Sequence, residues 1–178
     1  PQGTKVSCFG IVESGILKAV NNTINGVEQC HSYFEAKDLF PEFLYFTGRK
    51  NYVYTLIAEK KSTVLWIPVH VLEEMLEKDQ GLMYALLLYV CQRGLKDQLY
   101  LNCLNYQTIR ERIAYWIVGL HNLSPVESVH MPGSQLILAN MLHVSRSSLN
   151  QELKLMQKDG YFKVRGREMY ELDEEKLN

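Results

Sequence analysis

Over residues 1–68, hydrophobic and polar positions alternate in the manner of β-strands. Short β-branched and aromatic runs occur at residues 8–12, 16–20, 27–34, 53–58 and 63–68. The turn signals Glu13-Ser14-Gly15, Asn25-Gly26 and Thr47-Gly48 stand between these runs. Several short strands at regular spacing predict a small barrel or roll over residues 1–78. Because the sheet begins abruptly at Pro1, we expect a further element to precede it.

After Pro68 the hydrophobic period becomes that of helices. Residues 68–79 predict a short helix with Pro68 in its first turn. Residues 79–104 predict one long helix whose first half is apolar on nearly every side. Two sides of such a helix must be buried against other elements. One side can pack on the β domain, and the simplest partner for the other is the same helix of another subunit. We therefore expect residues 79–105 to form the dimerisation helix of a homodimer.

Residues 106–178 predict a winged helix-turn-helix domain. Its first helix carries an apolar face made by Ile109, Ile113, Trp116, Ile117 and Leu120.

Two capped helices and a hairpin follow. Ser134 is expected to cap the first of these helices, and Ser145 caps the second after a turn around His143. Gly160 is placed to end the second helix. The loop over residues 123–133 precedes this unit, and a hairpin with Arg165-Gly166-Arg167 at its tip closes it.

The second capped helix carries hydrogen-bonding groups on one side. Leu149, Leu153 and Met156 share one helical face and predict its anchorage on the core. Arginine can form two parallel hydrogen bonds with guanine O6 and N7, and asparagine or glutamine can form two with adenine N6 and N7. The candidate base-reading residues are therefore Arg146, Ser147, Asn150 and Gln151. The candidate phosphate contacts are Ser134, Ser145, Ser148, Lys154, Lys163, Arg165 and Arg167.

Charge supports the same interpretation. The chain has 178 residues, 47% of them hydrophobic and 22% charged, which is typical of a soluble globular protein, and its net charge is −1. The segment from Ser134 to Arg167, however, contains six cationic residues and only two anionic ones, Glu152 and Asp159. This local excess is where an anionic partner such as double-stranded DNA is expected. The alternative is a winged helix that binds another protein.

Several other classes of protein are disfavoured. The four cysteines contain no CxxC pair, which argues against a zinc site, a disulfide framework or an iron–sulfur cluster and fits a reducing cytoplasm. The longest apolar run, residues 82–91, is about half the length of a membrane helix, and residues 1–5 do not resemble a signal peptide. No hydrolase, P-loop or metalloprotease motif and no His-x-His pair of a cupin enzyme is present. We expect no catalysis, cofactor or metal.

The stretch "GSQLILANMLHVSRSSLNQELKLMQKDGYF" resembles the helix-turn-helix of the cyclic-AMP receptor/fumarate–nitrate regulator (CRP/FNR) family. "GIVESGILKAV" and "AKDLFPEF" resemble two segments of its sensor domain. The resemblance implies an α+β fold: an N-terminal β-roll (cupin-like, of the cyclic-nucleotide-binding type), a long dimerisation helix and a C-terminal winged helix-turn-helix. It also implies a dimeric transcription regulator that binds a palindromic operator and contacts RNA polymerase.

The resemblance assigns roles to individual residues. Arg146 matches the family's guanine-reading arginine, whereas Ser147 and Gln151 stand where Glu and Arg are frequent. The usual half-site sequence is therefore in doubt. His143 replaces a common turn glycine, and Glu152 stands at a position that is frequently apolar, for which the sequence offers no reason.

The sensor end departs further from the family. Glu42 keeps the position of the ribose-binding glutamate, but Tyr52-Val53 replaces the phosphate-binding Arg-Ser pair. A desolvated phosphate without a guanidinium partner is unfavourable, although Arg49 and Lys50 lie close enough in sequence to substitute. We therefore expect an effector other than a cyclic nucleotide, such as a small aromatic acid. The candidate pocket residues are Glu42, Phe43, Tyr45, Arg49, Tyr52, Tyr54, Tyr84 and Leu88.

Two alternatives remain open for the sensor end. The aromatic residues could form a packed core with no ligand. Alternatively, an intersubunit disulfide could control the regulator, provided that Cys91 or Cys103 lies on the dimer seam, because two cysteines twelve residues apart on one helix cannot pair within a chain.

Overall fold

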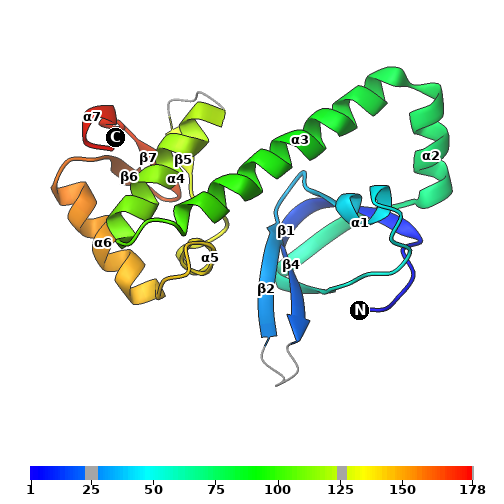
Figure 1. Ribbon diagram of the computed structural model, residues 1–178, viewed down its shortest axis with the longest axis horizontal. Helices are drawn as coiled ribbons and strands as arrows, with labels where there is room; N and C mark the ends of the chain where they lie inside the picture. Colours follow the sequence, from blue (N-terminus) through cyan, green and yellow to red (C-terminus); the bar gives the residue numbers. More distant parts are fainter. Residues whose placement is uncertain (23–27, 124–127, 178) are drawn as a thin grey trace. The chain divides into compact units, whose positions relative to one another are not determined.

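The computed structural model describes residues 1–22, 28–123 and 128–177 (Figure 1). The chain divides into two compact units, residues 1–90 and residues 91–178. Their boundary falls inside the long helix α3 (Gln80–Cys103), which matches the helix predicted from the sequence. None of the helices in the described ranges is long and apolar enough to cross a membrane.

Unit 1 is built on one long strand, β1 (Cys8–Asn22). It pairs antiparallel with β2 (Glu28–Phe34), β3 (Leu39–Phe40) and β4 (Thr55–Pro68). The pairing of β1 with β4 runs from Cys8 opposite Pro68 to Val20 opposite Thr55, and Figure 1 shows the two strands side by side. This arrangement confirms the β-roll predicted for the N-terminal part.

The predicted turn at Glu13-Ser14-Gly15 is wrong, because the chain continues there as one strand. The register between β1 and β4 shifts on both sides of Ser14, which marks β-bulges. Gly15 has φ +89°, and an added Cβ would collide with the Lys61 carbonyl oxygen, so glycine is required at this bulge. The five predicted runs therefore merge into fewer, longer strands.

The other two turn signals have different outcomes. The Asn25-Gly26 signal lies outside the described residues. The Thr47-Gly48 signal ends the short helix α1 (Glu42–Phe46), with Gly48 at φ +78°.

Helices close one end of the roll. The predicted short helix is present as α2 (Val69–Lys78), with Pro68 immediately before its first turn. Leu72 and Leu76 of α2 are buried with Phe9 and Leu39 of the strands. From α3, the Tyr89 hydroxyl accepts a hydrogen bond from the Leu39 backbone N–H at 2.8 Å and donates to the Leu39 carbonyl at 3.2 Å. The first turns of α3 therefore belong structurally to the roll.

Unit 2 contains the predicted winged helix-turn-helix. Its elements after α3 are α4 (Ile109–Leu123), β5 (Ser128–His130), α5 (Gln135–Met141), α6 (Arg146–Lys158), β6 (Lys163–Arg165), β7 (Glu168–Tyr170) and α7 (Glu174–Leu177). Trp116 of α4 is fully buried, as are Leu138 of α5 and Leu149 of α6. One core therefore joins the three helices.

The loop predicted over residues 123–133 contains a strand that sequence analysis missed. β5 pairs antiparallel with β7, which also pairs with β6, so the wing is a three-stranded sheet with the order β5-β7-β6. Three residues are too few to show a clear alternation, and the partner strand lies about forty residues further along the chain. The wing hairpin is thus supported by a third strand.

A close approach in unit 1 generates a testable expectation. A Cβ added to Gly10 would collide with the ring of Phe40, which is fully buried between Phe34 and Trp66. We expect Gly10→Ala to lower the free energy of unfolding of unit 1 by about 1–3 kcal/mol, the usual range for overpacking a core. Urea denaturation followed by Trp66 fluorescence, in a Trp116→Phe background, measures this transition alone.

The matched control is the Gly10→Ala/Phe40→Leu double variant. Removing the ring edge relieves the clash, so the two substitutions together must cost less than the sum of their separate effects. Strict additivity would show that Gly10 and Phe40 do not constrain each other.

Candidate nucleic-acid interface

Serine hydroxyls fix the starts of both helices of the helix-turn-helix. Ser134 Oγ accepts a hydrogen bond from the Ile137 backbone N–H at 3.3 Å, and Ser145 Oγ accepts one from Ser148 N–H at 3.0 Å. Both N-caps were predicted from the sequence and are confirmed. Between the helices, His143 adopts φ +53°, the left-handed conformation expected of the residue that replaces a turn glycine.

Helix α6 separates an inner apolar face from an outer polar one. Leu149, Leu153 and Met156 are buried, as the sequence predicted. Arg146, Ser147, Gln151 and Lys154 are exposed, and Asn150 is half-buried. Among the described residues, no ion pair involves Arg146, Lys154 or Lys158, so their charges are available to a ligand. The hydroxyls of Ser147 and Ser148 lie 2.9 and 2.8 Å from the Ser145 hydroxyl.

The wing is less positive than the sequence count indicated. Lys163 Nζ lies 2.5 Å from Glu171 Oε2, and this hydrogen bond raises the pKa of Lys163. Arg165 Nη2 lies 3.1 Å from Glu168 Oε2. The count of cations ended at Arg167, just before these carboxylates, and therefore overestimated the charge of the hairpin. Arg167 is also exposed at the tip, and within the described residues it has no ion-pair partner.

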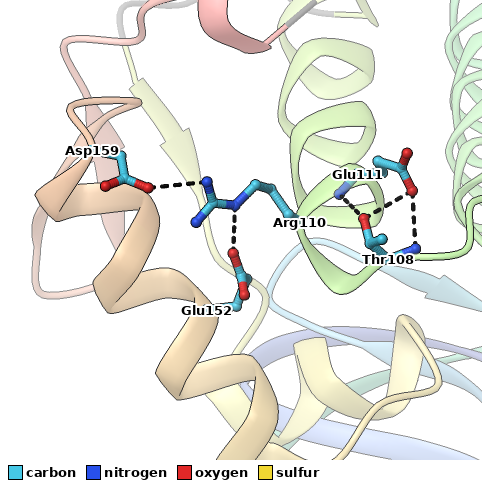
Figure 2. A network of polar contacts seen from close by, with 5 residues as sticks. All are labelled: Thr108, Arg110, Glu111, Glu152 and Asp159. Atoms are coloured by element: carbon cyan, nitrogen blue, oxygen red, sulfur yellow. Dashed lines mark hydrogen bonds and ion pairs between the residues drawn. The ribbon is translucent and has the colours of Figure 1, made fainter.

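One arginine of α4 connects that helix to α6 (Figure 2). Arg110 Nε donates to Glu152 Oε1 at 2.6 Å, and Arg110 Nη1 lies 3.0 Å from Asp159 Oδ2. The guanidinium also lies over the Tyr161 ring, 5.4 Å from its centroid. The hydrogen bond to Glu152 is the main cause of a raised pKa at Arg110. This contact explains why an acidic residue occupies position 152.

The start of α4 is held by a capping box, also drawn in Figure 2. Thr108 Oγ1 accepts from the Glu111 backbone N–H at 3.2 Å, and Glu111 Oε2 accepts from the Thr108 backbone N–H at 2.9 Å. The Thr108 backbone N–H is the main cause of a lowered pKa at Glu111. Arg112 then donates to the Leu142 carbonyl at 2.9 Å, at the end of α5. Residues of the first turn of α4 thus contact both helices of the helix-turn-helix.

Sequence analysis missed these contacts of α4, although two signals were present. The Thr108-x-x-Glu111 spacing is that of a capping box. Two arginines in a first helical turn are also unusual, because the positive end of the helix dipole disfavours cations there. Such cations indicate carboxylates or carbonyls supplied by another element.

The candidate effector residues do not gather into one cluster. Glu42 is buried at 2% exposure, whereas Phe43 is 40% exposed and Arg49 is exposed. The Tyr45 ring packs on Phe9 with centroids 4.9 Å apart, and its hydroxyl donates to Glu73. Tyr45 therefore belongs to the packing of α1 and α2 against the sheet.

Tyr52 and Tyr54 form a separate pair, with ring centroids 5.7 Å apart. Burial raises the pKa of Tyr52 to about 12, so its phenol stays protonated under ordinary conditions. This pair is the part of the predicted pocket that the fold brings together.

The two pocket candidates from α3 lie on the wrong side of that helix. Leu82, Leu86 and Tyr89 pack against the roll, whereas Tyr84 is 68% exposed and Leu88 46% exposed. An apolar helix does not reveal from its sequence which of its faces the sheet covers. Tyr84 and Leu88 instead belong to an exposed apolar stripe.

The thiols differ in accessibility. Cys103 is fully buried, and its burial raises its pKa to about 11, which makes it a poor thiolate. Cys91 is exposed on α3. In the part of the chain that the structure describes, no group of three or more His, Cys, Asp or Glu side chains could hold a metal ion.

Two family models match the chain. Residues 1–79 match the cyclic nucleotide-binding domain, and residues 111–178 match the Crp-like helix-turn-helix domain. No curated protein matches the sequence significantly.

Many solved structures share the fold, among them the following three. FixK2 from Bradyrhizobium japonicum is 15% identical, with a TM-score of 0.70 over 99% of this chain and 88% of that one. The CRP-family regulator TTHB099 from Thermus thermophilus is 19% identical, with a TM-score of 0.60 over 99% and 88%. CLP from Xanthomonas campestris is 20% identical, with a TM-score of 0.60 over 95% and 86%.

The two matched models follow each other in the order of the two compact units and together cover most of the chain. The capped helices, the left-handed turn residue and the wing lie within the second match. The chain therefore belongs to the CRP/FNR family of transcription regulators, with a cyclic-nucleotide-binding-type domain followed by a DNA-binding helix-turn-helix.

Proposed function

We propose that this regulator binds a palindromic operator in double-stranded DNA as a homodimer, with α6 in the major groove and the wing on the phosphate backbone. The observation that carries the proposal is the outer face of α6. It presents an exposed arginine, hydroxyls and amides in the first turns, and exposed lysines follow in the next turns. This is the order in which a recognition helix contacts bases and then phosphates.

Within α6, Arg146 is the proposed reader of guanine, and Asn150 and Gln151 are the proposed readers of adenine. The hydroxyls of Ser134 and Ser145 accept the capping hydrogen bonds, and the Ser148 hydroxyl lies 2.8 Å from that of Ser145. A hydroxyl can rotate, so each can turn its O–H toward a phosphate oxygen. On the wing, Arg167 is the leading phosphate contact, because Lys163 and Arg165 already have carboxylate partners.

Helix α3 is the proposed dimer interface. Tyr84, Leu88, Cys91 and Leu95 follow one another at intervals of four, three and four residues, the spacing of a coiled-coil seam. Each of these side chains is exposed within a single chain. Association of two such helices would bury the stripe and place two recognition helices on half-sites about one DNA turn apart.

The proposed effector is a small molecule other than a cyclic nucleotide, and the proposed location is the cytoplasm, where contact with RNA polymerase is expected. The Tyr52 and Tyr54 side chains stand near the place where the family has its phosphate-binding Arg-Ser pair. Arg49 and Lys50 are exposed, so a phosphate would not find a buried guanidinium in them. CLP, which shares the fold, is a c-di-GMP responsive regulator.

Base reading by α6 should depend on Arg146. Arg146→Ala should reduce discrimination between the preferred duplex and a duplex changed at one guanine by about 1–3 kcal/mol, because the bidentate contact is lost. Selection from random duplexes with the wild-type protein supplies the preferred sequence, and competition binding measures the ratio. Unchanged base preference in Arg146→Ala would place the reader elsewhere.

The two wing cations Arg167 and Lys163 should contribute differently to phosphate binding. Arg167→Ala should weaken binding to all duplexes alike and reduce the slope of log K against log salt by about one, since one phosphate contact is lost. Lys163→Ala should change the slope less, because Glu171 already binds that ammonium group. Equal slopes for the two variants would contradict the ion pair seen on the wing.

Dimer assembly should depend on the exposed stripe of α3. Leu88→Glu should convert the dimer into a monomer, because it places two like charges in the seam, and should reduce affinity for the palindrome more than for a half-site. Analytical ultracentrifugation measures the mass. Met83→Glu is the matched control, since it adds the same charge to an exposed position about 140° around the helix from Leu88. A dimer that tolerates Leu88→Glu would exclude this face.

A further inference from the structure

Both carboxylates of the segment from Ser134 to Arg167 bind the same side chain. Glu152 and Asp159 are the only acidic residues in this segment, and each contacts Arg110 of α4. The proposed DNA-contacting segment therefore has both of its carboxylates bound by one residue outside it, whose single positive charge offsets one of their two negative charges. Because Arg110 holds both carboxylates, the exposed lysines of α6 have no ion pair with them among the described residues.

The geometry makes Arg110 a bridge between two points of α6. Glu152 and Asp159 are seven residues apart, so they lie on one side of the helix, two turns or about 10 Å apart along its axis. Different nitrogens bind them: Nε binds Glu152, and Nη1 binds Asp159 (Figure 2). The ring of Tyr161, which follows the helix, lies under the same guanidinium. A planar guanidinium binds the two carboxylates through different nitrogens with fixed donor directions, whereas a compact ammonium group has no such fixed directions.

The site is unlike an ordinary surface ion pair. Arg110 lies in the first turn of α4, where the helix dipole disfavours a cation, so its two carboxylate partners must offset that cost. Its side chain is 36% exposed and that of Glu152 only 20% exposed. Isolated surface pairs contribute little to stability, but a network with one shared guanidinium restrains geometry more strongly.

We propose that Arg110 is the positioning residue of the recognition helix: it fixes the rotation and tilt of α6 on α4 by binding Glu152 and Asp159 together. This inference rests on the proposed function, in which α6 reads bases. The buried side chains Leu149, Leu153 and Met156 hold α6 against the core along one narrow stripe. A helix held along one stripe can still rotate about its own axis. A second line of contact, through residues 152 and 159, prevents that rotation.

Rotation matters because base recognition is directional. Hydrogen bonds weaken steeply as their angle departs from linearity, and a bidentate pair requires two bonds in one plane. Contacts with phosphates depend mainly on charge and tolerate small shifts. Loss of the bridge should therefore lower sequence discrimination while leaving non-specific binding governed by net charge.

Two bridge variants and one control distinguish the effect of positioning α6 from the effect of changing the net charge. Arg110→Lys keeps the net charge but cannot bind both carboxylates in the same way. Glu152→Gln removes one end of the bridge and makes the chain more positive by one unit. Glu175→Gln makes the same charge change on an exposed residue of α7, in the same unit and outside the bridge. The readout is the ratio of affinities for the selected duplex and a duplex altered at one base of each half-site.

We expect both bridge variants to lower this ratio by about five- to tenfold, the lower end of what one misaligned bidentate base contact costs. Glu175→Gln should leave the ratio unchanged. For the altered duplex, Arg110→Lys should bind like the wild type, and Glu152→Gln should bind slightly more tightly at low salt. Because the ratio is measured on one protein sample, a smaller folded fraction does not change it, and urea denaturation confirms that each variant folds.

An unchanged ratio in Arg110→Lys and Glu152→Gln would overturn the proposal and leave Arg110 an ion-pair partner of the two carboxylates only. The same experiment includes Arg146→Ala. If Arg146→Ala loses discrimination while the bridge variants keep it, this inference fails and the proposed function stands. If Arg146→Ala also keeps full discrimination, α6 is not the reader and both fail.

Discussion

A recognition helix must keep most of its surface polar, and this limits the apolar area that can hold it in place. Only three side chains of α6 are buried, although the helix has 13 residues. An amphipathic helix is normally stabilised by a broader apolar face. The other restraints on α6 are polar: the Ser145 cap at its start and the Arg110 contacts along its side. The folding of unit 2 therefore depends on placing polar groups correctly at the edge of an apolar core.

Local signals explain which features were predictable from the sequence. The caps at Ser134 and Ser145, the left-handed residue His143 and the helix end at Gly160 each depend on residues within four positions of one another. The apolar periods of α3 and α6 extend over several turns and were read correctly for the same reason. That the N-terminal part forms a β-roll was also predictable, because hydrophobic and polar residues alternate within each strand separately.

Features that depend on distant partners were not predictable. Whether Gly15 forms a turn or a bulge is decided by Ser62 and Lys61 on the opposite strand. Strand β5 is defined by β7, and the partner of Glu152 is an arginine 42 residues earlier. The pocket candidates on α3 were misplaced because the covered face of an apolar helix depends on the sheet beneath it. In each case the deciding atom belongs to another element.

The carboxylates of the wing have a kinetic consequence. Glu168 and Glu171 lie within hydrogen-bonding distance of Arg165 and Lys163, so at distances beyond a Debye length the hairpin has little net charge to attract DNA. Attraction during diffusion would come instead from the lysines of α6. A wing that reaches phosphate would then exchange one anionic partner for another after the encounter. Such a wing would lengthen the lifetime of the complex more than it would raise the rate of association.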